Sequence, residues 1–583
     1  MDKTLSFFKS HYLAVILAIF VGLITILPLF LAKWSLGPDY QGVPFIFSAN
    51  EDVYLAKMQE LAEGHWFSNS AYFYEYKKTP AVVPFFGEFI YSLPTIVFRI
   101  SVISTDILNK FLFPAILFLL VYWLILKLIN SAPQVGPKIN AIAGALFITL
   151  GYDLIDLKNA WLMLSGQDVS TKILMWARPV NPISGAILMF LFFLLIWSII
   201  NYSKSYLSII AGIVLGLMFG YIFSWSLSLM LCVSLAVVFL FKKNYKIFWR
   251  LLTVLFINFL ITMPYLMNAW RLIMAKGDSA LSTRNGMMFT HAPMVNKVIL
   301  LLTIIFILSS LFAYYKKIKI NENWWWFCLS LLISGWVCFN QQIITGRTIW
   351  PYHFVQYTIP ISIVVGLVLF FRFIRPYYFY VYFAAINIII LASLIFSFQA
   401  SASYKYDLAE FRRMQPYQPI FNYLNKQTEI DSVVLVREPT DDLTRLIPAF
   451  THDNVYVAPG GYDLEAPSER RNYNFLVKLK INGVKPEQLN DYLTKNNGLV
   501  RAFYFQNWQE VFSTEIDPWF EALAKDIRQQ YDQFYNKDFY QELKKYRLDY
   551  ILSTGPLEIA LLNELKNPRM TFQSNGFYFY NFE

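Results

Sequence analysis

Residues 12–32 read YLAVILAIFVGLITILPLFLA, an unbroken apolar run of the length that crosses a bilayer. The run exceeds the core of a typical signal peptide and ends without a small-residue cleavage pattern, so we expect a retained signal anchor. Of the 583 residues, 56% are hydrophobic and only 15% are charged, whereas charged residues make up about a quarter of a soluble domain. The sequence therefore predicts an integral membrane protein.

Ten further apolar runs follow, which predicts a multi-pass α-helical membrane protein with eleven transmembrane helices. They lie at 110–130, 138–152, 183–201, 206–222, 224–242, 247–268, 297–315, 325–345, 354–374 and 377–399. With a cytoplasmic N-terminus, every short loop on the inner side is basic, and those on the outer side are nearly bare. This pattern accounts for the net charge of +10 and argues against nucleic acid as a partner.

The long polar segments all fall on the non-cytoplasmic side of this topology. They are 33–109, 153–182, 269–296 and the tail after residue 400. We expect a transmembrane domain over 1–400 in a plasma (inner) membrane, and a soluble extracytoplasmic domain over 401–583. Transporters tend to keep loops short on both faces, so this asymmetry favours an enzyme.

The tail has the strand and helix alternation of a small α/β domain. Strands are expected at 432–436, 454–458 and 549–553, and helices at 441–450 and 519–546, with a terminal hairpin at 570–582 around Asn575-Gly576. Gly460-Gly461 follows a strand but lacks the spacing of a dinucleotide-binding loop.

The first long loop carries two adjacent carboxylates, Glu51 and Asp52, in the stretch SANEDVYL over 48–55. The apolar spacing that follows predicts an amphipathic helix along the membrane surface, ended by Gly64. A second such stretch, 85–99, is expected to be broken by Pro94. The doublet has two interpretations: Ser48-x-x-Glu51 fits a capping box, and a carboxylate there could also act as a general base.

An acidic motif in the first outer loop, followed by an aromatic and proline-rich stretch, resembles the GT-C superfamily of lipid-linked-sugar glycosyltransferases. Glu51-x-x-Tyr54 matches the Glu and Tyr of the Asp-Glu pair that many members carry, and Asn50 stands where the Asp would be. The resemblance implies catalytic Glu51 or Asp52, with Tyr54 lining the substrate site. It implies an inverting transfer from a polyprenyl-phosphate sugar to a hydroxyl on a glycan, lipid or protein.

The leaving phosphate of such a reaction needs cations at headgroup depth. Arg347 and His353 lie in an outer turn, against the positive-inside trend, and Arg178 ends the second long loop, so these three are the predicted phosphate ligands. Interfacial anchoring is the alternative for the Arg347 turn. Weaker substrate-lining candidates are Arg284, His291, Glu75 and Lys77, although the last two could instead pair with one another.

No cofactor follows with certainty from the sequence. The five scattered histidines have no zinc-binding spacing, and a divalent cation held by the acidic pair is left open. Two other functions compete with glycosyl transfer: a flippase for lipid-linked glycans, and a non-catalytic polysaccharide-assembly protein.

Overall fold

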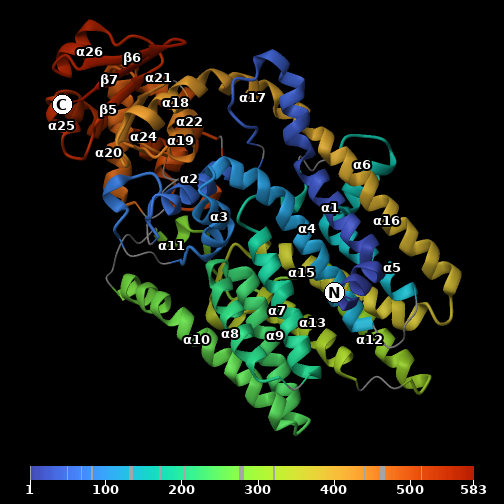
Figure 1. Ribbon diagram of the computed structural model, residues 1–583. Coiled ribbons are helices and arrows are strands. Elements are labelled where there is room, and N and C mark those ends of the chain that lie inside the picture. Colours follow the sequence, from blue (N-terminus) through green and yellow to red (C-terminus); the bar gives the residue numbers. More distant parts are fainter. Residues whose placement is uncertain are drawn as a thin grey trace.

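The computed structural model describes residues 2–582 apart from 47, 49, 67–68, 80–82, 130–134, 170–172, 203, 275–280, 319–321, 439, 441, 460–465, 512 and 514. The Gly460-Gly461 pair thus lies outside the described residues. A helical bundle fills one part of the molecule, and a sheet-containing domain covers one end of it (Figure 1).

Within the described residues, nine helical segments are long and apolar enough to cross a membrane. They contain α1 (Asp2–Leu36), α4 (Val102–Ile129), α7 (Ile183–Asn201), α9 (Ile222–Phe241), α10 (Tyr245–Met274), α12 (Lys297–Tyr315), α13 (Asn323–Asn340), α15 (Pro351–Leu369) and α16 (Phe379–Ser401). The other two predicted spans coincide with shorter helices, α5 (Val135–Thr149) and α8 (Tyr206–Leu217). The predicted multi-pass helical fold is confirmed.

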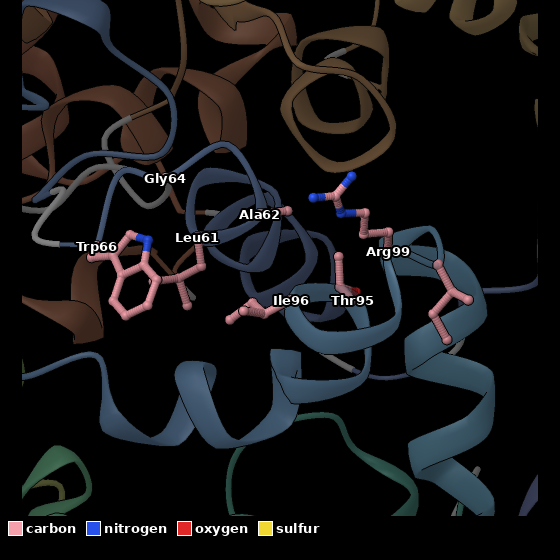
Figure 2. Close-up of a pocket in the computed structure, with 8 residues that line it drawn as sticks. Leu61, Ala62, Gly64, Trp66, Thr95, Ile96 and Arg99 are labelled. Atoms are coloured by element: carbon pink, nitrogen blue, oxygen red, sulfur yellow. The ribbon is translucent and has the colours of Figure 1, made fainter.

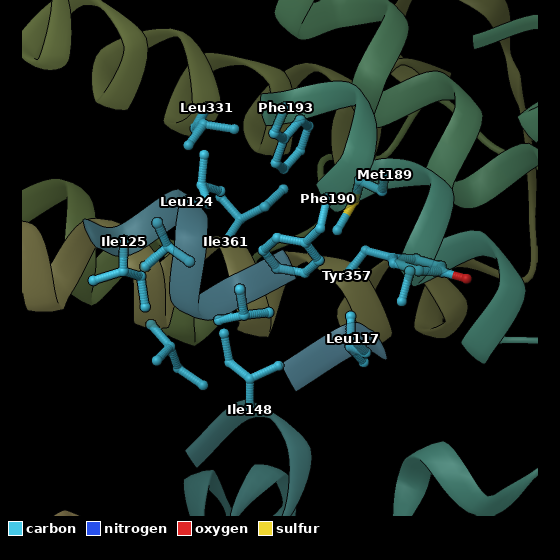
Figure 3. Close-up of a cluster of buried hydrophobic side chains, with 14 of the residues drawn as sticks. Leu117, Leu124, Ile125, Ile148, Met189, Phe190, Phe193, Leu331, Tyr357 and Ile361 are labelled. Carbon is cyan, nitrogen blue, oxygen red and sulfur yellow. The ribbon is translucent and has the colours of Figure 1, made fainter. Parts of the chain in front are cut away.

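The bundle is packed around α15, whose apolar window is 78% buried. Figure 3 shows side chains of α4, α5, α7, α13 and α15 meeting in one cluster, among them Leu117, Ile148 and Ile361. Gly144 lets two helices approach closely, because a Cβ there would lie 2.4 Å from Ile125 and 2.6 Å from Leu367. In lipid, burial of apolar surface does not drive helices together, and close packing at small residues such as this glycine stabilises their contacts instead.

The basic loops gather at one end of the bundle. Lys127, at the end of α4, lies 5.8 Å from the ring of Tyr202, which follows α7. Lys242, after α9, lies 5.6 Å from the ring of Trp326 in α13. The long polar segments lie at the opposite end (Figure 1), as the predicted topology requires, and the orientation of these ends in a membrane stays a prediction.

The tail forms a five-stranded sheet of order β4-β3-β5-β7-β6. Its strands are β3 (Val433–Arg437), β4 (Asn454–Val455), β5 (Tyr550–Ser553), β6 (Arg569–Ser574) and β7 (Phe577–Asn581). Strand β3 runs parallel to β4 and β5, and the β6–β7 hairpin is antiparallel. The predicted α/β architecture and hairpin are confirmed, while the strand expected at 454–458 shortens to two residues.

Helices cover both faces of this sheet, because alternate residues of β3 pack into two different apolar clusters. They are α17 (Leu408–Met414), α18 (Gln418–Gln427), α19 (Asp442–Phe450), α20 (Ser468–Ile481), α21 (Leu489–Lys495), α22 (Asn497–Tyr504), α23 (Trp508–Val511), α24 (Pro518–Tyr535), α25 (Phe539–Leu543) and α26 (Ile559–Glu564). The helix expected over 519–546 is therefore divided into α24 and α25. Asp538 begins α25 by accepting a hydrogen bond from the Gln541 amide.

The first long loop forms α2 (Glu51–Ala62) and α3 (Phe86–Phe98) and packs into the tail's core. Tyr72 and Phe73 are fully buried with residues of the sheet, and the Val455 amide donates to the Tyr72 carbonyl at 3.0 Å. One expectation is wrong, because Pro94 does not break α3. Helix α2 packs between α3, α4 and α19, and its position at the membrane surface stays a prediction.

Candidate active site

The acidic doublet lies in the first turn of α2, and both side chains are buried. Asn50 precedes the helix in the left-handed conformation, with φ of 59°, which Asn tolerates better than most residues. Glu51 is 1% exposed and Asp52 is 6% exposed. A buried carboxylate must be paired or protonated, so their partners decide what each can do.

Glu51 is held in a buried polar network. One carboxylate oxygen accepts from the Ser48 amide at 3.0 Å and the Ser48 hydroxyl at 2.7 Å. The other pairs with the Lys110 ammonium, which lies 2.8 Å from Asp106. Glu51 thus reaches back to the Ser48 amide, but the predicted capping box is not formed, because Asn50 is the N-cap and the Ser48 hydroxyl bonds the Glu51 carboxylate instead of a backbone amide. Its oxygens are occupied by partners, which suits a structural role.

Asp52 has fewer polar partners than Glu51. Its Oδ1 accepts from the Val53 amide at 3.0 Å, and Oδ2 is buried with no hydrogen-bond partner among the described residues. The nearest cation is Arg445 of α19, whose Nε lies 3.7 Å from Oδ2. Burial raises the pKa of Asp52 above its ordinary value, and the charge of Arg445 partly offsets this. A carboxylate with these properties suits a general base.

Arg178 lies beside Tyr54, two residues beyond Asp52. The loop before it is pinned by buried Trp176, whose indole N–H donates to the Ile148 carbonyl at 2.5 Å. The Arg178 guanidinium lies 5.5 Å from the centre of the Tyr54 ring, and its Nε is buried without a hydrogen-bond partner in the described part of the chain. A buried, unsatisfied guanidinium donor favours an anionic ligand.

His353 completes this polar cluster from α15. Pro351 occupies the first turn of α15, as prolines often do, and places His353 in that turn. Tyr221 donates to Gln356 at 3.0 Å and lies 3.4 Å from His353 Nδ1. Arg178 and Tyr54 both lie within electrostatic range of Tyr221. The structure therefore brings the predicted Tyr54, Arg178 and His353 together.

Arg347 lies on an exposed two-stranded ribbon formed by β1 (Met287–Phe289) and β2 (Arg347–Ile349). Its guanidinium lies 5.8 Å from the ring of Phe289. His291 is nearby, with Nδ1 3.0 Å from the carbonyl of Ile343, just before α14 (Gln342–Thr345) ends. The phosphate role of Arg347 stays a prediction.

Three of the weaker candidates join the first and third loops to the tail. Glu75 pairs with Arg470 at 2.5 Å. Lys77 pairs with Glu60 at 2.7 Å and also with Asp431. Arg284 is the last residue of α11 (Leu281–Arg284) and donates to Ser468 at 3.2 Å. The alternative that Glu75 and Lys77 pair with one another is wrong, because each has its partner elsewhere.

A cavity of about 390 Å³ lies between the C-terminal ends of α2 and α3. Trp66 and Arg99 flank it on either side of Leu61 and Ile96 (Figure 2). With a rise of 1.5 Å per residue, Leu61 lies about 14 Å along the helix axis from Asp52. This cavity is therefore separate from the acidic doublet.

The described residues include one group with metal-ligand chemistry: Glu60, Glu63, His65 and Asp431 have ligand atoms within 4.8 Å of one another. The ammonium of Lys77 already bridges Glu60 and Asp431 there. Burial and the nearby Glu60 raise the pKa of Glu63 to about 7. A protein cation thus already neutralises part of this group.

Sequence reasoning missed Lys110, Asp106, Arg445 and Tyr221. Lys110 and Asp106 had a readable signal, because two ionisable residues four apart at the start of an apolar helix are costly unless paired or functional. Arg445 had none, since its approach to Asp52 depends on how α19 packs against α2.

No protein-family model and no curated protein sequence matches the chain. Among solved structures it is similar to the archaeal oligosaccharyltransferase AglB from Archaeoglobus fulgidus, in complex with an inhibitory peptide and a dolichol-phosphate. The identity is 14% and the TM-score 0.40, and the alignment covers 94% of this chain and 70% of that chain. It is also similar to ArnT from Cupriavidus metallidurans in the apo state, with 12% identity and a TM-score of 0.41, over 84% of this chain and 92% of that chain. Both are GT-C membrane glycosyltransferases. The overlap is too loose to match residues, so the roles below rest on the site geometry.

Proposed function

We propose that the chain is an inverting glycosyltransferase, which moves a sugar from a polyprenyl-phosphate donor to an acceptor hydroxyl on the non-cytoplasmic face of a membrane. The observation that carries the proposal is the buried Oδ2 of Asp52, which has no hydrogen-bond partner among the described residues. Arg178, whose Nε is buried and also lacks a partner there, lies beside Tyr54, two residues further along the same helix.

Asp52 serves as the general base in this reaction. The acceptor oxygen attacks the anomeric carbon while its proton passes to Oδ2 of Asp52, and the bond from that carbon to the donor phosphate breaks. One displacement on one face inverts the anomeric configuration. Proton removal by a positioned carboxylate contributes about 10² to 10⁴ in rate.

Arg178 receives the leaving phosphate, assisted by Tyr54, Tyr221 and His353. A guanidinium binds a phosphate through two parallel hydrogen bonds, and it stabilises the charge that develops as the bond breaks. The N-terminus of α2 adds a favourable field for an anion at the same place. Glu51 holds this end of the helix in position through Lys110 and Ser48.

The direct test uses purified protein in proteoliposomes with radiolabelled polyprenyl-phosphate sugars. Label appearing on added glycan, lipid or protein acceptors, or slow release of free sugar, supports the proposal. Movement of intact donor across the bilayer with no bond cleavage contradicts it and favours a flippase. Donor that is neither cleaved nor moved favours an assembly protein.

A further inference from the structure

A second cavity, of about 430 Å³, lies in the sheet domain. It opens where β3 and β5 end, and the end of α20 and helix α21 complete it. Its lining residues are Arg437, Glu438, Asn482, Tyr492, Asn496, Ser553, Thr554, Gly555 and Pro556. Strands β3 and β5 are parallel neighbours, and ligands of α/β sheets bind outside the carboxyl ends of such strands. The cavity thus has the position of a binding site.

The lining carries polar groups whose charges are already compensated. Arg437 pairs with Glu558 at 2.8 Å. The buried Glu438 carboxylate accepts from the amides of Leu443 and Thr444 at 3.1 and 3.0 Å. Since neither charge is left without a counter-charge or donors, the cavity offers little attraction to an anion such as a phosphate.

The remaining groups suit a ligand rich in hydroxyls. The side-chain amide of Asn482 has no hydrogen-bond partner among the described residues, and Asn496 donates to the Tyr492 carbonyl, which leaves its amide oxygen as an acceptor. Tyr492 and Ser553 line the same space. Amides, hydroxyls and one aromatic ring provide both donors and acceptors for a neutral sugar.

We propose that this cavity binds a neutral oligosaccharide segment, and, resting on the proposed function, that this segment belongs to the acceptor. Glu438 links the two sites, because it fixes the first turn of α19 through Leu443 and Thr444. Arg445 follows one residue later in that helix, with its Nε 3.7 Å from Asp52. A glycan in the cavity therefore lies at the end of the helix that contacts the candidate base.

The test measures binding of the full chain, in nanodiscs, to an array of neutral and acidic oligosaccharides, with unglycosylated peptides as a further arm. Gly555 gives a blocking variant, because a Cβ there meets no atom within 4 Å. Gly555→Trp should fill the cavity and weaken binding about tenfold or more, while Gly555→Ala, the matched control, should bind like the parent. Asn482→Ala, which removes hydrogen-bonding groups without filling space, should also weaken binding.

Binding of neutral oligosaccharides that is lost in Gly555→Trp and kept in Gly555→Ala supports the proposal. Binding of peptides or acidic oligosaccharides alone overturns it, as does an absence of binding or equal binding by all variants. Asp52→Asn separates this proposal from the proposed function: it should bind the oligosaccharide normally, whether or not transfer requires Asp52.

Discussion

Replacing Lys110 by Met tests the buried charge network that holds the acidic doublet. Lys110 is 1% exposed, and its ammonium pairs with Glu51 and with Asp106. The substitution keeps the apolar stem but leaves two buried carboxylates facing each other without a cation. Breaking a buried ion pair in this way costs about 3–5 kcal/mol. For a cooperative unit of about 200 residues this corresponds to a fall of roughly 10 °C in unfolding temperature.

Thermal unfolding of the purified protein in detergent measures this effect. Arg412→Met is the control, because Arg412 and Asp39 are 57% and 60% exposed and pair at 3.3 Å, and an exposed pair contributes under about 1 kcal/mol. A triple variant, Lys110→Met with Glu51→Gln and Asp106→Asn, removes the uncompensated charges and should recover most of the loss. The reasoning is refuted if Lys110→Met unfolds at the temperature of the parent, or if the triple variant is no better than the single one.

Three further predictions concern the donor site and the response to pH. Arg178→Ala should raise the donor KM about tenfold because it removes a buried phosphate ligand, and Arg347→Ala should change it less because its exposed charge is screened; the reverse order in steady-state kinetics would reassign the phosphate site. Asp52 must be ionised to act, so kcat/KM falls as pH drops through its pKa. Arg445→Ala removes the cation that lowers that pKa, so the fall of kcat/KM at low pH should shift to higher pH. A pH profile that does not shift counts against Asp52 as the base. The pKa of Glu63 is raised from 4.5 to about 7 in the fold, so its contribution to stability is complete below pH 4.5 and is lost as pH rises through 7. Glu63→Gln should flatten that decline in the unfolding temperature, and parallel curves would contradict this.

The apolar runs predicted the spans well, because a membrane helix must satisfy its backbone internally and leaves a long hydrophobic signature. The tail's strands and its Asn575-Gly576 turn were predictable for a similar reason, since both depend on local residue preferences. Both turn residues have positive φ in the structure, 49° and 81°, as a tight hairpin turn requires.

Contacts between distant segments could not be predicted in this way. The spacing of apolar residues in α2 shows that one face is buried, but not whether lipid or protein covers it. The structure covers α2 with α19 of the tail, nearly four hundred residues along the chain. For the same reason the sequence left the roles of Glu51 and Asp52 open. Their difference depends on Lys110 and Arg445, which reach them from α4 and α19.

The transfer rate of Asp52→Asn, measured beside Glu51→Gln with a radiolabelled polyprenyl-phosphate sugar, tests the central claim most directly. Asp52→Asn should unfold at or above the temperature of the parent, bind donor normally and lose at least about a hundredfold in rate. Glu51→Gln should instead lower the unfolding temperature, because it weakens the pairing with Lys110. Transfer by Asp52→Asn at the rate of the parent would contradict the account.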